Sequence, residues 1–212
     1  MLGFQANAAT FTLESTTVVL DEQERRVAFN VKNDGAEPIL LVSKLDDLND
    51  DEKMSQQILV APPIARIDPG QSQQVNFALK KGVKLDHEYM LKASFEGGAQ
   101  RGRGSMAMPV RQEVGFILQP SAIPPVRTPW QDLKLTAAGR RLTVANPGKH
   151  VIRLANTLAL LPGDKSIALA HSYLMPGDSQ TLEIDGAAEQ VRIIPLSRYG
   201  LVQDAVTLPI TR

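Results

Sequence analysis

The sequence predicts an all-β protein built from two domains. Apolar residues recur with a period of two far more often than with a period of three or four, as they do in half-buried strands. These runs are short and are separated by Gly, Pro, Asn and Asp, which favour turns. The chain has 212 residues, which is more than one domain usually contains and enough for two β-sandwiches.

About seven predicted strands precede residue 120, the number found in a constant-type immunoglobulin domain. Six of them read TFTLESTTVVL, RRVAFNVKN, PILLVSKL, QQILVAPP, SQQVNFAL and EYMLKASFE. The seventh is SMAMPVRQEVGF, residues 105–116, which follows the tract EGGAQRGRG. We interpret this glycine-rich tract as a flexible connection between strands. Residues 10–120 are therefore predicted to form an immunoglobulin-like sandwich.

The seventh strand combines apolar alternation with a proline. Pro109 falls in the middle of the run, and proline has no backbone N–H to donate to a neighbouring strand. We therefore expect this strand at a sheet edge or at a bulge. An apolar edge invites pairing with another chain, so its retention indicates that a partner covers it. Alternatively, the same side chains face the core of their own domain. Alternation places on one face Met106, Met108, Val110, Gln112 and Val114.

A proline-rich segment predicts the boundary between the domains. QPSAIPPVRTPW contains four prolines within residues 120–129, which is too stiff and poor in donors for a central strand. A second series of predicted strands follows this segment. We therefore predict that residues 121–212 form a second β-sandwich. The series consists of LKLTAAGRRLTVAN, read as a hairpin around Ala138 and Gly139, then HVIRLANTLALL, SQTLEI, EQVRIIPL and DAVTLPI.

The first nine residues resemble the end of an export signal. Ala6, Asn7 and Ala8 fit the small-residue pattern that precedes a signal-peptidase cut. Residues 1–9 are thus interpreted as a remnant of a signal peptide, or alternatively as a disordered terminus or a cloning scar. No run approaches the roughly 20 apolar residues of a membrane-spanning helix, so membrane insertion is not expected.

Composition gives little support for catalysis, metal binding or nucleic-acid binding. Lys plus Arg and Asp plus Glu both number 23, so no net charge attracts nucleic acid. The absence of cysteine excludes disulfides, thiol nucleophiles and thiolate metal sites. His87, His150 and His171 are far apart and form no zinc-binding pair. No nucleophile elbow or phosphate-binding loop occurs, so we expect neither an enzyme nor a cofactor or metal.

Seven segments together resemble the PapD-like periplasmic pilus-assembly chaperones. The resemblance extends over nearly the whole chain, and no single segment is very specific. The segments follow one another in the order expected of that family: VAPPIARIDPGQSQQVNF, LDHEYML, FILQPSAIPP, WQDLKL, LTVANPGKHVIRL, YLMPGDSQTL and SRYG. The resemblance implies two immunoglobulin-like domains, a periplasmic location, and partners that are incomplete pilin or fimbrial subunits.

In that family, the seventh strand of the chaperone donates alternating apolar side chains to the open groove of the subunit. The resemblance thus implies that Met106, Met108 and Val110 belong to the subunit-binding strand. An outer-membrane usher is the further partner that the resemblance implies. A free chaperone is also expected to cover the same edge by forming a homodimer. The competing interpretation is a structural or adhesive two-domain protein that shares only the fold.

The sequence departs from the family at the residues that bind the subunit's carboxy-terminus. Family members use an Arg in the first strand and a Lys near the end of the seventh, and the matching positions hold Thr17 and Gly115. Neither residue is charged, so the usual charge-assisted hydrogen bonds to a carboxylate are lost. Arg111 is a nearby cation, although alternation places it on the face opposite Val110.

A second departure concerns an interdomain contact. The family connects its domains through a Glu, an Arg and an Asp, whose places are taken by Glu88, Gln119 and Arg198. We expect Glu88 and Arg198 to pair across the cleft between the domains, exposed at the surface, where such a pair contributes on the order of 0–1 kcal/mol.

Overall fold

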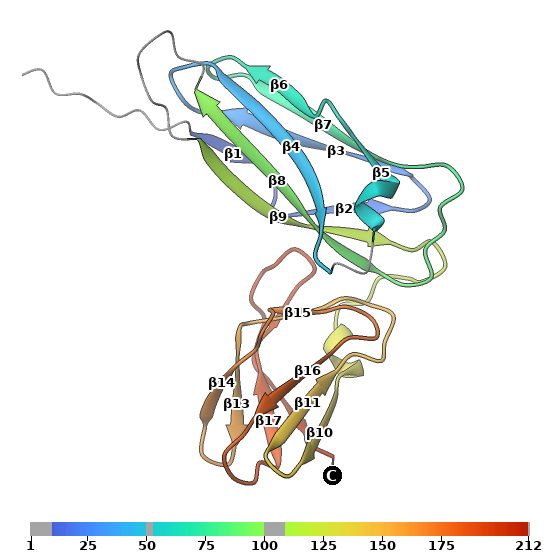
Figure 1. Cartoon of the computed structure of the whole chain (residues 1–212), viewed down its shortest axis with the longest axis vertical. Coiled ribbons are helices and arrows are strands. Elements are labelled where there is room, and N and C mark those ends of the chain that lie inside the picture. Colours follow the sequence, from blue (N-terminus) through green and yellow to red (C-terminus); the bar gives the residue numbers. More distant parts are fainter. Residues whose placement is uncertain (1–9, 50–52, 100–108, 212) are drawn as a thin grey trace, which may run out of the picture. The chain divides into compact units, whose positions relative to one another are not determined.

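The computed structural model describes residues 10–49, 53–99 and 109–211, and in this part of the chain the structure consists of strands and two short 3-10 helices (Figure 1). The all-β class predicted from the sequence is confirmed. The described residues divide into two compact units. The first consists of the described residues up to Lys84 and from Met90 to Leu118, and the second of Leu85–Tyr89 and the described residues from Gln119 onward. The predictions for residues 1–9, Met106 and Met108 lie outside the described residues.

The first unit has a four-stranded sheet, in the order β1-β3-β7-β5, and a five-stranded sheet, in the order β2-β9-β8-β4-β6. A 3-10 helix, Met54–Gln57, precedes β5. The strands are β1 Phe11–Leu13, β2 Thr17–Asp21, β3 Arg26–Asn33, β4 Ile39–Asp47, β5 Ile58–Ala61, β6 Ile64–Ile67, β7 Ser72–Leu79, β8 Tyr89–Ala99 and β9 Val110–Gln119.

The first predicted strand, residues 10–20, is divided between the two sheets. β1 pairs with β3, whereas β2 lies beside β9 in the other sheet. The break falls at Ser15, whose hydroxyl donates to the Thr17 carbonyl at 3.1 Å and accepts the Thr17 N–H at 3.3 Å. Such local side-chain bonds compete with the ladder of a strand, so the chain turns from one sheet to the other at this point.

Four phenylalanines join the two sheets of the first unit. Phe29 and Phe77 come from one sheet and Phe95 and Phe116 from the other, and all four are fully buried. The rings of Phe29 and Phe95 are stacked with centroids 5.1 Å apart, and those of Phe77 and Phe116 meet edge-on at 4.9 Å. Aromatic pairs of this geometry add to the energy of burial, so the end of β9 is fixed in the core.

Glycines in β8 have a packing role. A Cβ on Gly97 would lie 2.8 Å from Cδ1 of Phe11, so only glycine lets that buried ring approach the strand. Gly97 and Gly98 both lie within β8. The interpretation of the tract EGGAQRGRG as a connection is therefore wrong for these two residues, while its continuation at residues 100–108 lies outside the described residues.

The second unit contains three small sheets, in the orders β10-β11-β16, β15-β12-β18 and β14-β13-β17-β19. The predicted hairpin at Gly139 joins β10 and β11, and Gly139 adopts a positive φ of 59°. Trp130, from the 3-10 helix Pro129–Asp132, packs into a mainly aliphatic core. The strands are β10 Lys134–Ala138, β11 Arg141–Ala145, β12 Ile152–Leu154, β13 Thr157–Leu161, β14 Lys165–Ala168, β15 Tyr173–Leu174, β16 Ser179–Glu183, β17 Gln190–Ile193, β18 Pro195–Leu196 and β19 Val206–Pro209.

Each unit contains a buried asparagine with the same set of hydrogen bonds. In Asn33 and in Asn146, Oδ1 accepts the N–H of the residue two positions later, and Nδ2 donates to the carbonyl four positions later. Nδ2 also donates to a distant carbonyl, that of Ile67 for Asn33 and that of Leu174 for Asn146. The two sandwiches thus use the same polar junction to fix a turn against a neighbouring segment.

Candidate functional site

Strand β9 has two halves with different surroundings. It lies between β2 and β8, but it has ten residues and β2 has five, so β2 can pair with at most half of it. Figure 1 shows β2 beside the carboxy-terminal half of β9. Residues 116–119 are fully buried, whereas no residue of 110–115 is. The second half of β9 is thus central in its sheet, and the segment predicted as an edge or bulge, residues 105–116, ends where this buried half begins.

The first half of β9 alternates between half-buried and exposed side chains. Val110, Gln112 and Val114 are half-buried, and Arg111 and Glu113 are exposed. Nε2 of Gln112 donates to the carbonyl of Phe11 in the other sheet at 2.6 Å. The half-buried face therefore points toward the inside of the sandwich and continues into its core. This part of the strand therefore faces its own domain, which covers it only partly, and its coverage by a partner stays a prediction.

Pro109 lies immediately before β9, which begins at Val110. The sequence-based expectation placed this proline in the middle of a continuous strand, and that expectation is wrong. A proline just outside a strand costs no hydrogen bond of the ladder.

The two positions that match the family's carboxylate anchors are placed as follows. Thr17 is 2% exposed, and its hydroxyl donates to the Thr16 carbonyl at 2.8 Å. Gly115 lies half-buried in β9. Arg111 is on the exposed face, where its Nη2 lies 3.0 Å from Oε1 of Glu113. None of these positions therefore forms a buried cationic site in the first unit.

A buried cluster in the second unit brings together Glu88, Gln119 and Arg198. The backbone N–H of Glu88 donates to the Lys149 carbonyl at 2.9 Å, and its Oε2 accepts the N–H of Val151 at 2.9 Å. Nη2 of Arg198 lies 3.3 Å from Oε1 of Glu88 and donates to Oε1 of Gln119 at 2.7 Å. All these residues belong to the second unit, so a role between domains stays a prediction.

The Glu88–Arg198 pair is largely withdrawn from solvent. The side chain of Glu88 is 7% exposed and that of Arg198 is 24% exposed, so the expectation of a surface pair is wrong. Burial raises the pKa of Glu88 above its ordinary value, because the charged carboxylate loses its hydration. The Val151 N–H and the Arg198 guanidinium lower this pKa and offset part of the effect.

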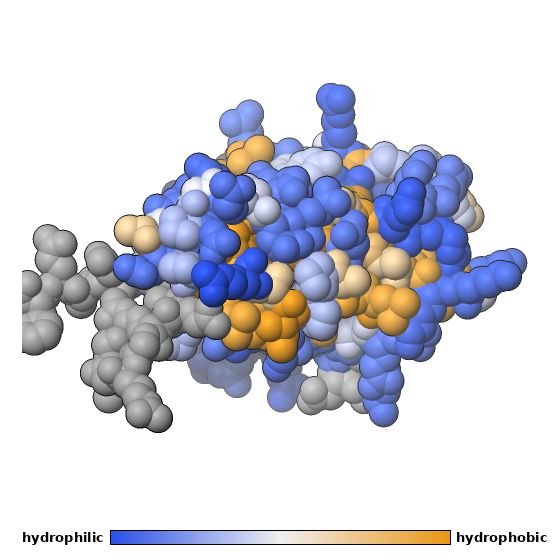
Figure 2. All heavy atoms as spheres, turned by 90° about the horizontal axis from the view of Figure 1, so that it is seen from above, coloured by the Kyte–Doolittle hydropathy of each residue, from blue (hydrophilic) through white to orange (hydrophobic). Residues whose placement is uncertain are grey.

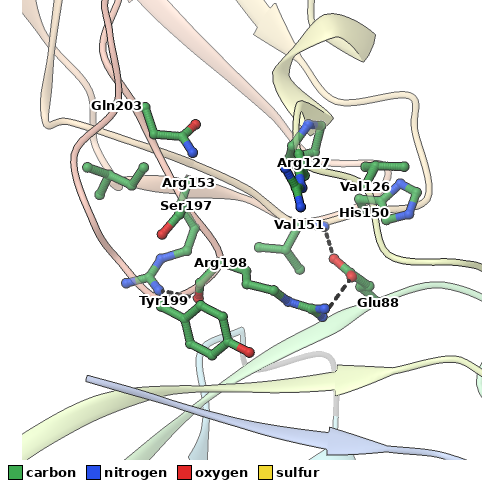
Figure 3. Close-up of a pocket in the computed structure, with 12 residues that line it drawn as sticks. Glu88, Val126, Arg127, His150, Val151, Arg153, Ser197, Arg198, Tyr199 and Gln203 are labelled. Carbon is green, nitrogen blue, oxygen red and sulfur yellow. Dashed lines mark hydrogen bonds and ion pairs between the residues drawn. The ribbon is translucent and has the colours of Figure 1, made fainter. Parts of the chain in front are cut away.

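A cavity of about 320 Å³ adjoins this cluster, and Figure 3 shows the side chains around it. Arg153 lies in its wall, where Nη1 donates to the Arg198 carbonyl at 3.0 Å. Burial lowers the pKa of Arg153, since a desolvated guanidinium is less stable. We call this the arginine cavity. It is lined by Glu88, Val126, Arg127, Pro129, His150, Val151, Arg153, Leu196, Ser197, Arg198, Tyr199 and Gln203.

Comparison with known proteins decides the family. Residues 10–124 match the family described as pili and flagellar-assembly chaperone, PapD N-terminal domain. The fimbrial chaperone YhcA of Escherichia coli K12 is 30% identical over 190 residues, which cover 88% of this chain and 84% of that protein. The chain belongs to the PapD-like chaperone family.

Other known proteins resemble the present chain in sequence or in fold. The chaperone protein MrkB of Klebsiella pneumoniae is 22% identical over 94% of this chain and 91% of its own length. The fold matches the structure of the Salmonella enterica SafA pilin in complex with the SafB chaperone, with a TM-score of 0.77, 20% identity and coverage of 96% and 99% of the two chains. The E. coli chaperone DraB gives a TM-score of 0.76 at 22% identity, with coverage of 95% and 98%. These matches confirm the two immunoglobulin-like domains.

The surface of this chaperone carries exposed apolar side chains. Such side chains gather among polar ones on the face in Figure 2. In the first unit, Leu40, Leu59 and Ile64 are exposed on β4, β5 and β6, and β5 and β6 are the last strands of their sheets. Apolar groups on an unpaired edge strand favour association with another chain. Within the described residues, every helix is too short and too polar to cross a membrane.

Sequence reasoning assigned a role to Glu88 and Arg198 but missed the other residues of the arginine cavity, among them Arg127, Arg153 and Gln203. Arg153 stands between two buried apolar residues of β12, Ile152 and Leu154. An arginine within so apolar a strand was the available signal, because long cationic side chains there need a specific environment. Gln203 lies in an irregular segment and carries no comparable pattern.

Proposed function

We propose that the protein is a periplasmic chaperone that binds, caps and delivers pilin or fimbrial subunits by strand donation. The donated strand comprises the first half of β9 and the residues before it, including Met106 and Met108. Family membership supports the class of partner, and pairing with an added strand is an established mode of peptide recognition.

The observation that carries this proposal is the unequal coverage of β9. Its first half keeps a row of half-buried side chains whose sheet neighbour β2 is too short to follow the whole strand. A subunit strand placed there would complete the ladder and cover Val110 and Val114. Full burial of a Val side chain from water gains about 1.5–3 kcal/mol, of which these half-buried residues would gain part.

Native mass spectrometry of the tagged protein, co-expressed with a pilin subunit of its host, tests this function. We expect a one-to-one complex that Val110→Asp abolishes, because a carboxylate would be placed against the subunit. Arg111→Asp is the control, because it introduces a carboxylate one residue away on the exposed face, with an even larger change of net charge. Unchanged thermal melting of both variants establishes that they fold. A complex that survives Val110→Asp, or that both variants abolish equally, would reject strand donation.

The remaining expectations follow from the same role. An outer-membrane usher would receive the loaded chaperone, and the free protein would cover the start of β9 by forming a homodimer. Strand donation requires no bond-breaking step, nucleotide or metal, so a chaperone of this kind needs neither catalysis nor a cofactor. Homodimers should dissociate when a subunit binds, which analytical ultracentrifugation can measure. Dimers that persist in the complex would place self-association elsewhere.

A further inference from the structure

The arginine cavity carries an excess of positive charge. Its wall holds the guanidinium groups of Arg127, Arg153 and Arg198 but a single carboxylate, that of Glu88. That carboxylate already accepts the Val151 N–H and pairs with Arg198. Arg127 is exposed and forms no ion pair with any residue that the structure describes. Guanidinium groups bind carboxylates and phosphates in a fork of two hydrogen bonds, so the cavity is suited to an anion.

The same cavity contains a buried hydrogen-bond acceptor. Oε1 of Gln203 is buried and accepts no hydrogen bond from the described residues. The residue is held in place by its backbone N–H, which donates to the Pro195 carbonyl at 2.9 Å. In Figure 3 the side chains of Gln203 and Arg127 come from different sides of the cavity, and the side chain of Arg198 extends along it toward Glu88. A buried acceptor favours a ligand with a donor, since leaving it unpaired is costly.

Apolar groups complete the wall. Val126, Val151, Leu196 and Tyr199 line the cavity beside the charged residues, and Val126 and Tyr199 are exposed. A ligand that satisfies all three features has an anionic group, an N–H donor and an apolar body. Free phosphate can donate to Gln203 through a P–OH group of its hydrogen-phosphate forms, but it has no apolar body to cover the apolar part of the wall.

We propose that the arginine cavity binds the carboxy-terminal residue of a polypeptide chain. The terminal carboxylate pairs with Arg127 and Arg198, and the N–H of the last residue donates to Oε1 of Gln203. The apolar side chain of that residue packs against Val126 and Tyr199. A volume of about 320 Å³ is at the small end for ligand pockets and suits one residue rather than a longer segment. The site is independent of strand donation, because all its residues belong to the second unit.

Nuclear magnetic resonance titration of the full chain tests the ligand class. The probes are acetyl-Gly-Gly-Phe as the free acid and the same peptide as the carboxamide. The acid should shift the Arg Nε–Hε signals of Arg127 and Arg198 and the side-chain amide signals of Gln203. The carboxamide should bind about ten- to a hundredfold more weakly, because it loses the hydrogen bonds to a charged group. Equal affinity of the two peptides would overturn the proposal.

Two variants test separately the contributions of the Arg127 cation and of the Gln203 acceptor to peptide binding. Arg127→Gln should weaken binding of the acid about tenfold, whereas Arg141→Gln, an exposed position on β11 outside the cavity, should leave it unchanged. Gln203→Leu should weaken binding of the acid, but not of an analogue whose last amide N–H is replaced by an ester oxygen. Equal effects of Arg127→Gln and Arg141→Gln would reject the assigned cation.

Inorganic phosphate provides the remaining control. If phosphate shifts the same signals at the same concentration as the peptide acid, the cavity is a general oxyanion site and the peptide assignment is wrong. Unchanged Trp130 fluorescence in each variant shows that the second unit remains folded, because Trp130 packs in its core.

Discussion

Each unit contains a polar junction of the same kind around a buried asparagine, but the two units differ in where their charged side chains lie. Asn33 and Asn146 make the same set of hydrogen bonds, each in its own sandwich. Every buried polar side chain of the first unit is neutral among the described residues, whereas the second unit buries Glu88 against Arg198. In the first unit, the ion pair of Arg111 and Glu113 lies on the exposed face of β9.

This difference determines which unit responds to charge and to pH. An exposed ion pair competes with water and contributes little, whereas a buried pair becomes costly when one partner is removed. The first unit therefore depends on packing and neutral hydrogen bonds, and its exposed charges on β9 can be changed without loss of the fold. The second unit is expected to lose stability when the charge balance of its cluster changes.

The largest effect is expected for Arg198→Ala. This change leaves the Glu88 carboxylate buried with the Val151 N–H, and it removes a donor from Gln119. The second unit should lose about 3 kcal/mol, at the low end for a buried pair because Arg198 is 24% exposed. Urea unfolding followed by the fluorescence of Trp130, the single tryptophan of the sequence, measures this loss.

A double-mutant cycle sharpens that result. In a Glu88→Gln background, Arg198→Ala should reduce stability by at least about 1 kcal/mol less than it does in the protein with Glu88, because no buried charge is left without a partner. The same cost in both backgrounds would mean that Arg198 acts through packing rather than through charge.

The asparagine junctions should be equivalent in the two units. Asn33→Ala and Asn146→Ala each remove three hydrogen bonds, so each should cost about 2 kcal/mol. Amide hydrogen exchange assigns each loss to its own unit. Asn76→Ala, at an exposed position of β7, is the control. A much larger effect in one unit would contradict the equivalence of the junctions.

Stability of the second unit should depend on pH through Glu88. Because its pKa in the folded state is raised above 4.5, the folded protein binds the proton more tightly than the unfolded chain. This contribution to stability is fully present below pH 4.5 and is lost as the pH rises through the folded pKa. Glu88→Gln removes the dependence. Urea midpoints of both proteins across this range test the sign, and a difference that grows in the opposite direction would refute it.

Sequence patterns predicted the strands more reliably than their sheet partners. Period-two alternation identified β3 and β7 because each has one buried face, whereas β8, which lies between β9 and β4, buries residues on both of its faces. It could not divide residues 10–20 between two sheets, since alternation does not specify a neighbour. The break depends on hydrogen bonds of a single side chain, that of Ser15.

Only part of each candidate site could be predicted from the sequence. Matching to the family brought Glu88, Gln119 and Arg198 together, but their burial depends on how residues 85–89 pack in the second unit. A glutamate in the polar segment LDHEYML carries no sign of burial. The arginine cavity joins residues far apart in the chain, such as Arg127 and Gln203, and no local pattern predicts that arrangement.

The smallest effect is expected for Glu113→Gln in the first unit. Oε1 of Glu113 lies 3.0 Å from Arg111 and 3.4 Å from Lys92, and all three side chains are at least a third exposed. Solvent screens such pairs, so the change should cost less than about 1 kcal/mol, even though it removes two ion pairs. Raising the salt concentration should reduce the difference from the original protein further. Amide hydrogen exchange in β8 and β9 measures this loss of stability. A loss as large as that of Arg198→Ala would show that the exposed ion pairs of the first unit contribute as much as the buried pair of the second.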